Sequence, residues 1–240
     1  VSVVFQAAQS CLNPVYTIGE QIIETYREHG DDRATDALLE EAKQYLAYVR
    51  LEGNRILSCY PHELSGGMKQ RVMIAFALLL KPKVVILDEP TTALDVITQD
   101  YIFDILQQIH KDLGVTLILL THDIAVVAKV ATRMAVMYAG KVIEEGNIFD
   151  IFKSPAHEYT RQLINSAPSL LDDVNERRSI TGSPPDLLNL PKGCYFSPRC
   201  TMCIDKCFVE PPPHIDIGNE RSVSCFCWRE IMAKDGASNE

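Results

Sequence analysis

The chain has 240 residues, of which 47% are hydrophobic and 23% are charged, so it can bury at least one sizeable core. Its formal net charge of −9 repels phosphate backbones, which argues against nucleic acid as a main partner. The longest apolar stretch, residues 72–80, is far shorter than the roughly 18 residues that a membrane-spanning helix needs.

The first quarter of the chain predicts a strand followed by a helical subdomain. An apolar run ends at Gln6, as a buried strand does where it reaches a site. Thr17 and Glu20 form a capping box, with apolar residues at helical spacing behind it. The expected elements are a strand over residues 1–5, a helix from Thr17, a helix over residues 33–50, and a subdomain of about residues 15–64 that Pro61 closes.

From Ser65 onward, strands and helices alternate along the chain. The expected helices cover residues 65–80, 98–111 and 123–130, and the expected strands cover residues 84–87, 115–120 and 134–138, the last turning at Ala139-Gly140 into Val142-Ile143. This alternation favours an α/β fold with a mainly parallel sheet that helices cover on both faces. Ligands bind such sheets where the carboxyl ends of the strands emerge.

The composition changes after about residue 171. Six of the eight cysteines and seven of the thirteen prolines lie beyond this point. We therefore expect a main domain over residues 1–170 and a Cys/Pro-rich C-terminal extension over residues 171–240.

Three groups of polar residues stand where the predicted elements meet. Asp88 and Glu89 directly follow an apolar strand, where a Mg²⁺ ion and a reacting water would offset two adjacent carboxylates; the alternative is a simple turn. Ser65 and the glycines after it can cap a helix and approach a phosphate closely, or form only a capped turn. His122 follows the next strand, where an imidazole can donate to a phosphate; most single histidines are surface residues.

In this combination and order, these residues resemble the nucleotide-binding subunits of ATP-binding cassette (ABC) transporters. Residues 64–68 resemble the family signature, residues 84–89 the Walker B strand, residues 93–95 the D-loop, His122 the switch histidine and Gln6 the Q-loop glutamine. The segments LNPVYTIGEQI, DEPTTALDVITQ, VMYAGKVIEEG and HEYTRQLINSAPSL are similar to the oligopeptide and dipeptide importer ATPases, in their D-type subunit more than the F-type. The fold that the resemblance implies is P-loop NTPase-like.

The resemblance also implies a role for each motif residue. Gln6 would sense the γ-phosphate and Mg²⁺ and relay to the permease, Asp88 would support Mg²⁺, Glu89 would act on the attacking water, and His122 would stabilise the transferring phosphoryl group. Ser65, Gly66 and Gly67 would contact ATP bound by a second ATPase subunit, with Asp95 at the shared interface. The spacing of the residues leaves action within one chain equally open.

One element of the resembled family is missing from the sequence. No G-x-x-x-x-G-K-[ST] motif occurs, so no phosphate-cradling loop and no lysine of that loop are present. In that family the loop precedes the Q-loop glutamine. We therefore expect a strand, loop and helix of about 30 residues or more before Val1, and we expect this chain alone to bind ATP weakly and to be inactive.

The cysteines of the extension predict a cluster or metal site. Disulfides are not expected in a cytosolic chain, and a Pro-rich segment with little core of its own gains from a metal staple. The C-terminal pattern resembles the [4Fe–4S] ligand set of some peptide-importer members, which implies Cys194, Cys200, Cys207 and Cys225 as ligands. Zn²⁺ and unligated thiols stay open, with Cys203 and Cys227 as substitutes.

The resulting hypothesis is an ATP-hydrolysing subunit of an importer of oligopeptides, dipeptides or related solutes such as nickel. It would act as a dimer at the cytoplasmic face of the cell membrane, on permease subunits and indirectly with an external solute-binding protein. Two alternatives stay open: an ABC ATPase without a transport role, and a non-enzymatic remnant that carries only the cysteine module.

Overall fold

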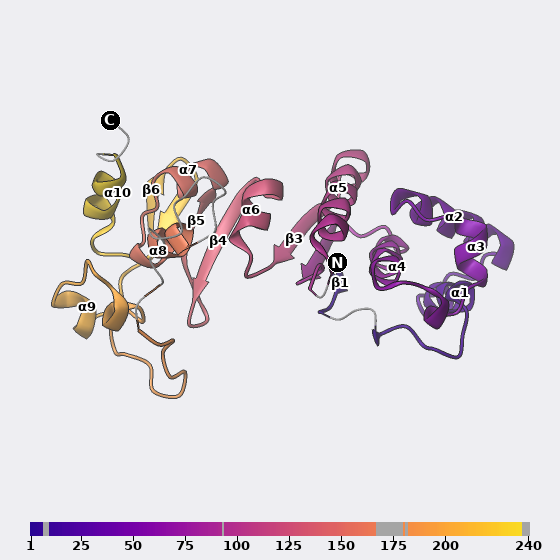
Figure 1. Cartoon of the computed structure of the whole chain (residues 1–240), viewed down its shortest axis with the longest axis horizontal. Coiled ribbons are helices and arrows are strands. Elements are labelled where there is room, and N and C mark those ends of the chain that lie inside the picture. Colours follow the sequence, from indigo (N-terminus) through magenta and orange to yellow (C-terminus); the bar gives the residue numbers. More distant parts are fainter. Residues whose placement is uncertain (7–9, 93, 167–179, 181, 237–240) are drawn as a thin grey trace. The chain divides into compact units, whose positions relative to one another are not determined.

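The computed structural model describes residues 1–6, 10–92, 94–166, 180 and 182–236, and only the backbone for residues 235–236. The chain forms two compact units, Val1–His122 and Asp123–Glu240, whose elements are labelled in Figure 1. Among the described residues, no helix combines the length and the apolar character needed to cross a membrane.

The first unit contains the predicted parallel sheet. Its strands are β1 (Ser2–Val4), β2 (Val84–Asp88) and β3 (Thr116–Leu120), in the order β1-β2-β3. Val3 pairs with Ile86, and Ile86 pairs with Ile118, so β2 is hydrogen-bonded on both sides. Because the strands are parallel, their carboxyl ends meet at one edge. This confirms the sequence prediction and brings Gln6, Glu89 and His122 to that edge.

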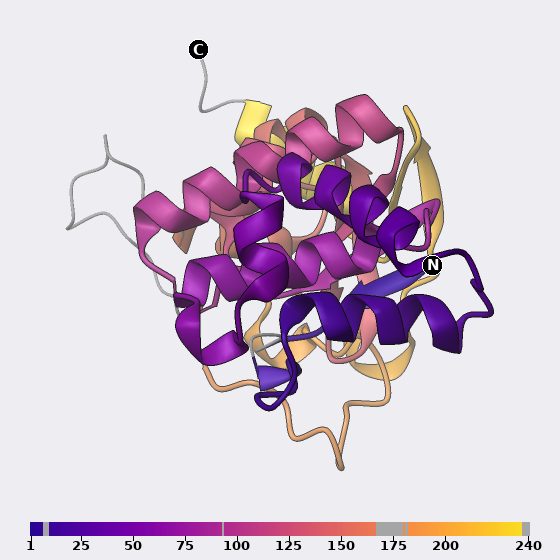
Figure 2. The same cartoon turned by 90° about the vertical axis from the view of Figure 1, so that its right-hand side faces the viewer.

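Helices form the connections between these strands. They are α1 (Ile18–Glu28), α2 (Thr35–Tyr48), α3 (Gly53–Ser58), α4 (Gly66–Leu78) and α5 (Val96–Leu113), with a 3₁₀ turn over Pro61–Glu63. Figure 2 turns these helices toward the viewer. The predicted capping box is present, since the Thr17 N–H donates to Glu20 at 2.7 Å and the Glu20 N–H donates to Thr17 at 3.2 Å. The short helix α3 has no counterpart among the predicted elements.

Two caps set where α4 and α5 begin. The Ser65 hydroxyl accepts the N–H of Met68 at 3.4 Å, and the Asp95 carboxylate accepts the N–H of Thr98 at 2.9 Å. The Asp95 cap starts α5 two residues earlier than the predicted helix over residues 98–111. Gly114, at φ 64°, ends the helix in the left-handed conformation that glycine adopts without strain.

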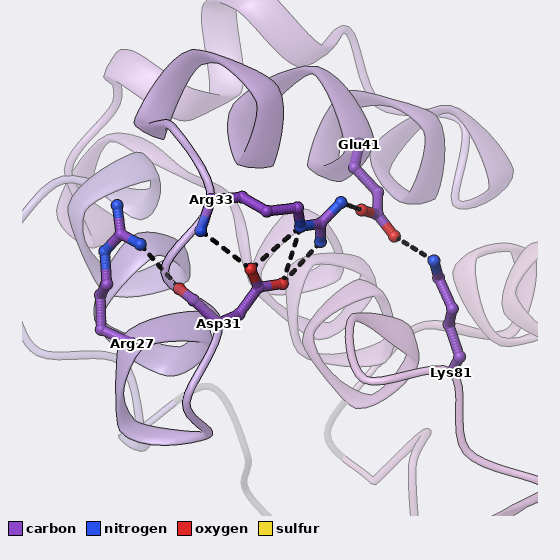
Figure 3. Close-up of polar contacts among 5 residues, drawn as sticks. All are labelled: Arg27, Asp31, Arg33, Glu41 and Lys81. Atoms are coloured by element: carbon purple, nitrogen blue, oxygen red, sulfur yellow. Dashed lines mark hydrogen bonds and ion pairs between the residues drawn. The ribbon is translucent and has the colours of Figure 1, made fainter.

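An ion network links α2 to the loop between α4 and β2. Glu41 of α2 lies 2.7 Å from the guanidinium of Arg33 and 2.7 Å from the ammonium of Lys81 (Figure 3). Arg33 also pairs with Asp31 at 2.6 Å. The side chain of Glu41 is only 13% exposed, whereas those of Arg33 and Lys81 are 49% and 69% exposed. Glu41 is therefore the mostly buried centre of the network.

Replacing Glu41 with alanine should lower the thermal unfolding midpoint by about 2–4 °C at pH 7, because Arg33 and Lys81 would lose their shared carboxylate. Lys81 and then Arg33 hold the pKa of Glu41 below its usual value. The ionised form is thus the one that the fold stabilises. This contribution is present above the ordinary glutamate pKa of about 4.3 and is lost as the pH falls through the lowered native pKa.

Calorimetry of Glu41→Ala and the unchanged protein, at pH 7 and at successively lower pH, tests this pH dependence of the unfolding midpoint. The matched control is Glu40→Ala on the same helix, which removes an exposed pair with Lys43 and should change the midpoint little. If the unfolding midpoint of Glu41→Ala stays below that of the unchanged protein by the same amount as the pH falls below 4, the ionic explanation is contradicted.

The second unit contains an antiparallel sheet. Its strands are β4 (Arg133–Tyr138), β5 (Lys141–Asn147), β6 (Ile215–Gly218) and β7 (Arg221–Val223), in the order β4-β5-β7-β6. Its helices are α6 (Ile124–Val130), α7 (Ile148–Lys153), α8 (Glu158–Ser166), α9 (Lys206–Val209) and α10 (Trp228–Gly236), with a 3₁₀ turn over Ser197–Arg199.

The strand predicted over residues 134–138 belongs to this antiparallel sheet, and not to the parallel one. The turn after it explains why. Ala139 and Gly140 have φ angles of 46° and 79°, and a two-residue turn with two positive φ angles joins antiparallel strands. The mainly parallel pattern therefore holds for β1 to β3 only.

The core of the second unit combines aromatic packing with a buried ion pair. Tyr138, Tyr159 and Phe196 contact one another with ring centroids 4.7 to 5.3 Å apart. Nearby, Glu144 of β5 is 0% exposed and lies 2.6 Å from the guanidinium of Arg221 of β7, which is 5% exposed. Glu144 also accepts the backbone N–H groups just before α8, and Arg221 donates to backbone carbonyls of Asp150 and Ser154.

Candidate functional site

Glu89 stands directly after β2 in an unusual backbone conformation. Its φ angle is 44°, a left-handed value that costs a non-glycine residue roughly 1–2 kcal/mol. The Glu89 N–H donates to the carbonyl of Leu120, the last residue of β3, at 2.9 Å. This bond fixes the bend at the edge where the strands end. Asp88, the last residue of β2, is half-buried beside it.

Three side chains from different segments converge on the Glu89 carboxylate. Gln6, which follows β1, donates its amide N–H to Oε2 at 3.0 Å. His122, which follows β3, places Nδ1 2.7 Å from Oε1. Thr92 donates its hydroxyl to Oε2 at 2.8 Å. The sequence-predicted Gln6, Glu89 and His122 therefore form one hydrogen-bonded group at the carboxyl edge of the parallel sheet.

This arrangement keeps the carboxylate ionised. The contacts from His122 and then Thr92 hold the pKa of Glu89 below its usual value. The His122 side chain is 79% exposed, while that of Glu89 is 24% exposed, so the imidazole stands open to solvent above a more sheltered carboxylate. Such a pair can orient a water molecule and donate to an anion placed beside it.

The signature glycines and Asp95 form a second group at the start of α4 and α5. Gly67 lies so close to Thr98 that a Cβ on it would stand 2.8 Å from the Thr98 methyl carbon. The Asp95 carboxylate accepts two hydrogen bonds from Thr98, one from the Thr98 backbone N–H and one, at 2.7 Å, from the Thr98 hydroxyl. Among the described residues, no hydrogen bond or ion pair joins this group of Ser65, Gly67 and Asp95 to Glu89.

Sequence reasoning missed Thr92 and Arg71. Thr92 lies three residues after Glu89, in a turn, and this spacing is the signal that could have assigned its hydroxyl to the carboxylate. Arg71 donates to the carbonyls of Val49 and Arg50 and stacks its guanidinium 5.3 Å from the Tyr101 ring centroid. A contact between segments so far apart in the chain has no local sequence signal.

A cavity of about 850 Å³ lies among α1, α2 and α3, away from these two groups. Its walls include Glu20, Leu39 and Leu57. None of the sequence-predicted site residues lines it.

All four predicted cysteine ligands line one small cavity in the second unit. Cys194, Cys200, Cys207 and Cys225 face it together with Cys227. The backbone joins two of these segments closely, since the Cys194 N–H donates to the Cys207 carbonyl at 2.8 Å. Gly193 permits this approach, because a Cβ there would collide with the Cys207 carbonyl.

The thiols around this cavity are shielded from water. Burial raises the pKa of Cys194 and Cys225, and raises the pKa of Cys200 to about 12. The free volume is about 10 Å³, and no group of three or more His, Cys, Asp or Glu side chains in the described part of the chain is arranged to hold a metal ion directly.

Two polar side chains that the sequence did not single out also line this cavity. Ser197 is 3% exposed, and its hydroxyl has no hydrogen-bond partner among the described residues. His157 is 2% exposed, and burial lowers its pKa to about 4, so the ring is neutral. Its Nδ1 accepts the Tyr159 N–H at 3.0 Å, which leaves the ring proton on Nε2.

Solved structures define the class of protein. Residues of this chain align with cbiO1 from Clostridium perfringens, part of an ABC transporter complex, at 32% identity and a TM-score of 0.56, over 63% of this chain and 58% of that one. A dimeric ABC cassette in a post-hydrolysis state with ADP and Pi aligns at 31% identity and a TM-score of 0.52, over 61% of this chain and 62% of that one. The fold is that of an ABC ATPase cassette.

Sequence comparisons narrow this class. The family model "ABC transporter" matches residues 1–92, and "Oligopeptide/dipeptide transporter, C-terminal region" matches residues 143–207. The dipeptide transport ATP-binding protein DppD of Caldanaerobacter subterraneus is 46% identical, over 96% of this chain and 71% of that protein. The oligopeptide transport proteins AppD of Bacillus subtilis and OppD of Escherichia coli are 41% and 42% identical, over 98% and 88% of this chain and 71% and 63% of their own lengths.

The chain belongs to the ABC transporter ATPases, in the group whose C-terminal region is that of the oligopeptide/dipeptide transporters.

Proposed function

We propose that this chain supplies ATP hydrolysis to an importer of dipeptides or oligopeptides. The observation that carries the proposal is the convergence of Gln6, His122 and Thr92 on the Glu89 carboxylate at the carboxyl edge of the parallel sheet. The peptide substrate follows from the names of the relatives, which are transport proteins for dipeptides and oligopeptides. Related solutes such as nickel stay possible within this proposal.

In this function Glu89 would hold the attacking water. Its lowered pKa makes it a weak proton acceptor, which favours positioning of the water over full proton removal in the ground state. His122 would donate to the oxygens of the transferring phosphoryl group. Gln6 would report the presence of the γ-phosphate to the permease through its contact with Glu89.

Asp88 and Gln6 suit Mg²⁺ as ligands. Both offer the hard oxygen donors that this ion prefers, and the Gln6 amide points its N–H at Glu89, which leaves its carbonyl oxygen for a cation. Mg²⁺, when bound with ATP, neutralises the charge of the β- and γ-phosphates.

Ser65, Gly66 and Gly67 would contact the nucleotide of a second ATPase subunit, with Asp95 at the shared interface. Two observations support this arrangement. The Asp95 group and the Glu89 group each have their own hydrogen bonds, and one of the structural relatives is a dimeric cassette. The helix start at Ser65 presents N–H groups, which suit a phosphate.

We further propose that the subunit sits at the cytoplasmic face of the cell membrane on permease subunits, with an external solute-binding protein as an indirect partner. The cassette would span residues 1–170 and the extension residues 171–240. Part of the boundary region, residues 167–179, lies outside the described residues.

The cysteine module would hold a [4Fe–4S] cluster through Cys194, Cys200, Cys207 and Cys225. Three observations support the fit: all four thiols line one cavity, Gly193 lets their segments approach, and the buried Ser197 hydroxyl has no partner among the described residues. When bound, such a cluster supplies an electron acceptor or a structural staple. Iron and sulfide analysis of protein purified without oxygen tests this against zinc and free thiols.

Transport coupling is tested on the subunit assembled with its permease in membranes. We expect the permease to copurify with the subunit, and ATP hydrolysis to rise when peptide-loaded binding protein is added. Hydrolysis that never depends on a permease would contradict the transport role and favour an ABC ATPase of another function.

A further inference from the structure

One hydrogen-bond donor at the cysteine cavity, the Ser197 hydroxyl, has no partner in the described part of the chain. Ser197 begins the 3₁₀ turn Ser197–Arg199, between Cys194 and Cys200 in the chain. Because this hydroxyl is buried away from water, leaving it without a partner costs free energy. A native fold carries such a cost where another molecule or group supplies the missing partner.

His157 adds a second donor on another wall of the cavity. Its ring contacts Phe196 with centroids 5.9 Å apart, and the Tyr159 N–H occupies Nδ1. Two constraints therefore fix both the orientation and the tautomer of the ring, with the proton on Nε2. A neutral imidazole held in this way is a donor and not a charge.

The remaining walls are mainly sulfur and apolar side chains. Besides the cysteines, the cavity is lined by Met202, Pro212 and Phe226. The one carboxylate at the cavity, Glu158, is already bonded to Arg161, Gln162 and Thr201. Among the side chains that the structure describes at this cavity, sulfur is therefore the most abundant acceptor.

We infer that Ser197 and His157 are positioning residues that donate hydrogen bonds to the sulfurs of a cluster held in this cavity. The inference rests on the proposed [4Fe–4S] cluster. A hydrogen bond to a sulfur stabilises the more negative, reduced form of a cluster, so such donors raise its reduction potential.

The test is a reductive titration of the full chain, purified without oxygen, in which dithionite adds one electron to the cluster through mediator dyes. The Ser197→Ala and His157→Phe variants should each titrate at a lower potential than the unchanged protein. Phenylalanine keeps an aromatic ring beside Phe196 and removes both ring nitrogens. His157→Gln, which restores an N–H donor, should titrate closer to the unchanged protein than His157→Phe.

Ser166→Ala is the matched control, because the Ser166 hydroxyl is already bonded to the Leu163 carbonyl and does not line the cavity. Its potential should be unchanged. Equal potentials for Ser197→Ala, His157→Phe and the unchanged protein, at equal iron content, would overturn the inference and leave the cluster proposal standing. Protein without iron and sulfide would overturn the cluster proposal itself.

Discussion

Replacing Glu89 with glutamine, in a subunit that also carries a phosphate-cradling loop, is expected to lower the rate of ATP hydrolysis by the assembled transporter about 100-fold or more, the usual contribution of a positioned acid–base group. Glutamine keeps the size of the side chain and an oxygen for Thr92, but it removes the negative charge that aligns His122 and the attacking water. ATP binding should persist, because Glu89 acts on the water and not on the nucleotide itself. Phosphate release in a single-turnover assay measures the chemical step directly.

Glu28→Gln is the control for this experiment. Glu28 is an exposed residue at the end of α1. Its replacement makes the same change, from a carboxylate to an amide, away from the sheet edge. Its hydrolysis rate should be unchanged. A Glu89→Gln variant with more than half of the normal single-turnover rate would show that another group performs the role assigned to Glu89.

The second large effect is on stability. Replacing Arg221 with methionine should destabilise the second unit by about 3–5 kcal/mol, since it leaves the Glu144 charge buried without its partner. Trp228, the single tryptophan, lies in α10 of the same unit, so its fluorescence during urea unfolding reports on this part of the fold.

Two further variants test whether the unpaired buried charge causes the loss of stability in Arg221→Met. Adding Glu144→Gln to Arg221→Met should recover part of the loss, because the amide removes the charge and still accepts a backbone N–H before α8. Arg133→Met removes an exposed pair with Glu220 on the same sheet and should cost less than about 1 kcal/mol. Equal losses for Arg221→Met and Arg133→Met would contradict the buried-pair account.

Three residues of the candidate site could be expected to lie together from the sequence because each of them follows a predicted strand. Gln6, Glu89 and His122 stand at the ends of three apolar runs, and a parallel sheet brings such ends to one edge. The spacing could not predict the direct bonds to Glu89, which depend on its left-handed backbone. The same limit applies to α3, a six-residue helix too short to show a hydrophobic period.

The second unit was harder to predict, because its contacts join residues far apart in the chain. The sequence predicts a strand over residues 134–138 and a turn into residues 142–143, but the partner strand β7 pairs at Glu144 with Val223, far along the chain. Glu144 and Arg221 look like ordinary surface residues in sequence, and only the pairing of β5 with β7 buries them together. The family resemblance named four cysteines that line one cavity, and it did not name Ser197 and His157 beside them.

Peptide uptake by the reconstituted transporter tests whether ATP hydrolysis at Glu89 drives transport. Proteoliposomes would contain the assembled transporter with Mg-ATP on the side of the ATPase subunit and a labelled dipeptide with its binding protein on the other side. If hydrolysis at Glu89 drives transport, uptake requires ATP and disappears in the Glu89→Gln variant, while ATP remains bound. Equal uptake by the unchanged and the Glu89→Gln transporters would contradict it.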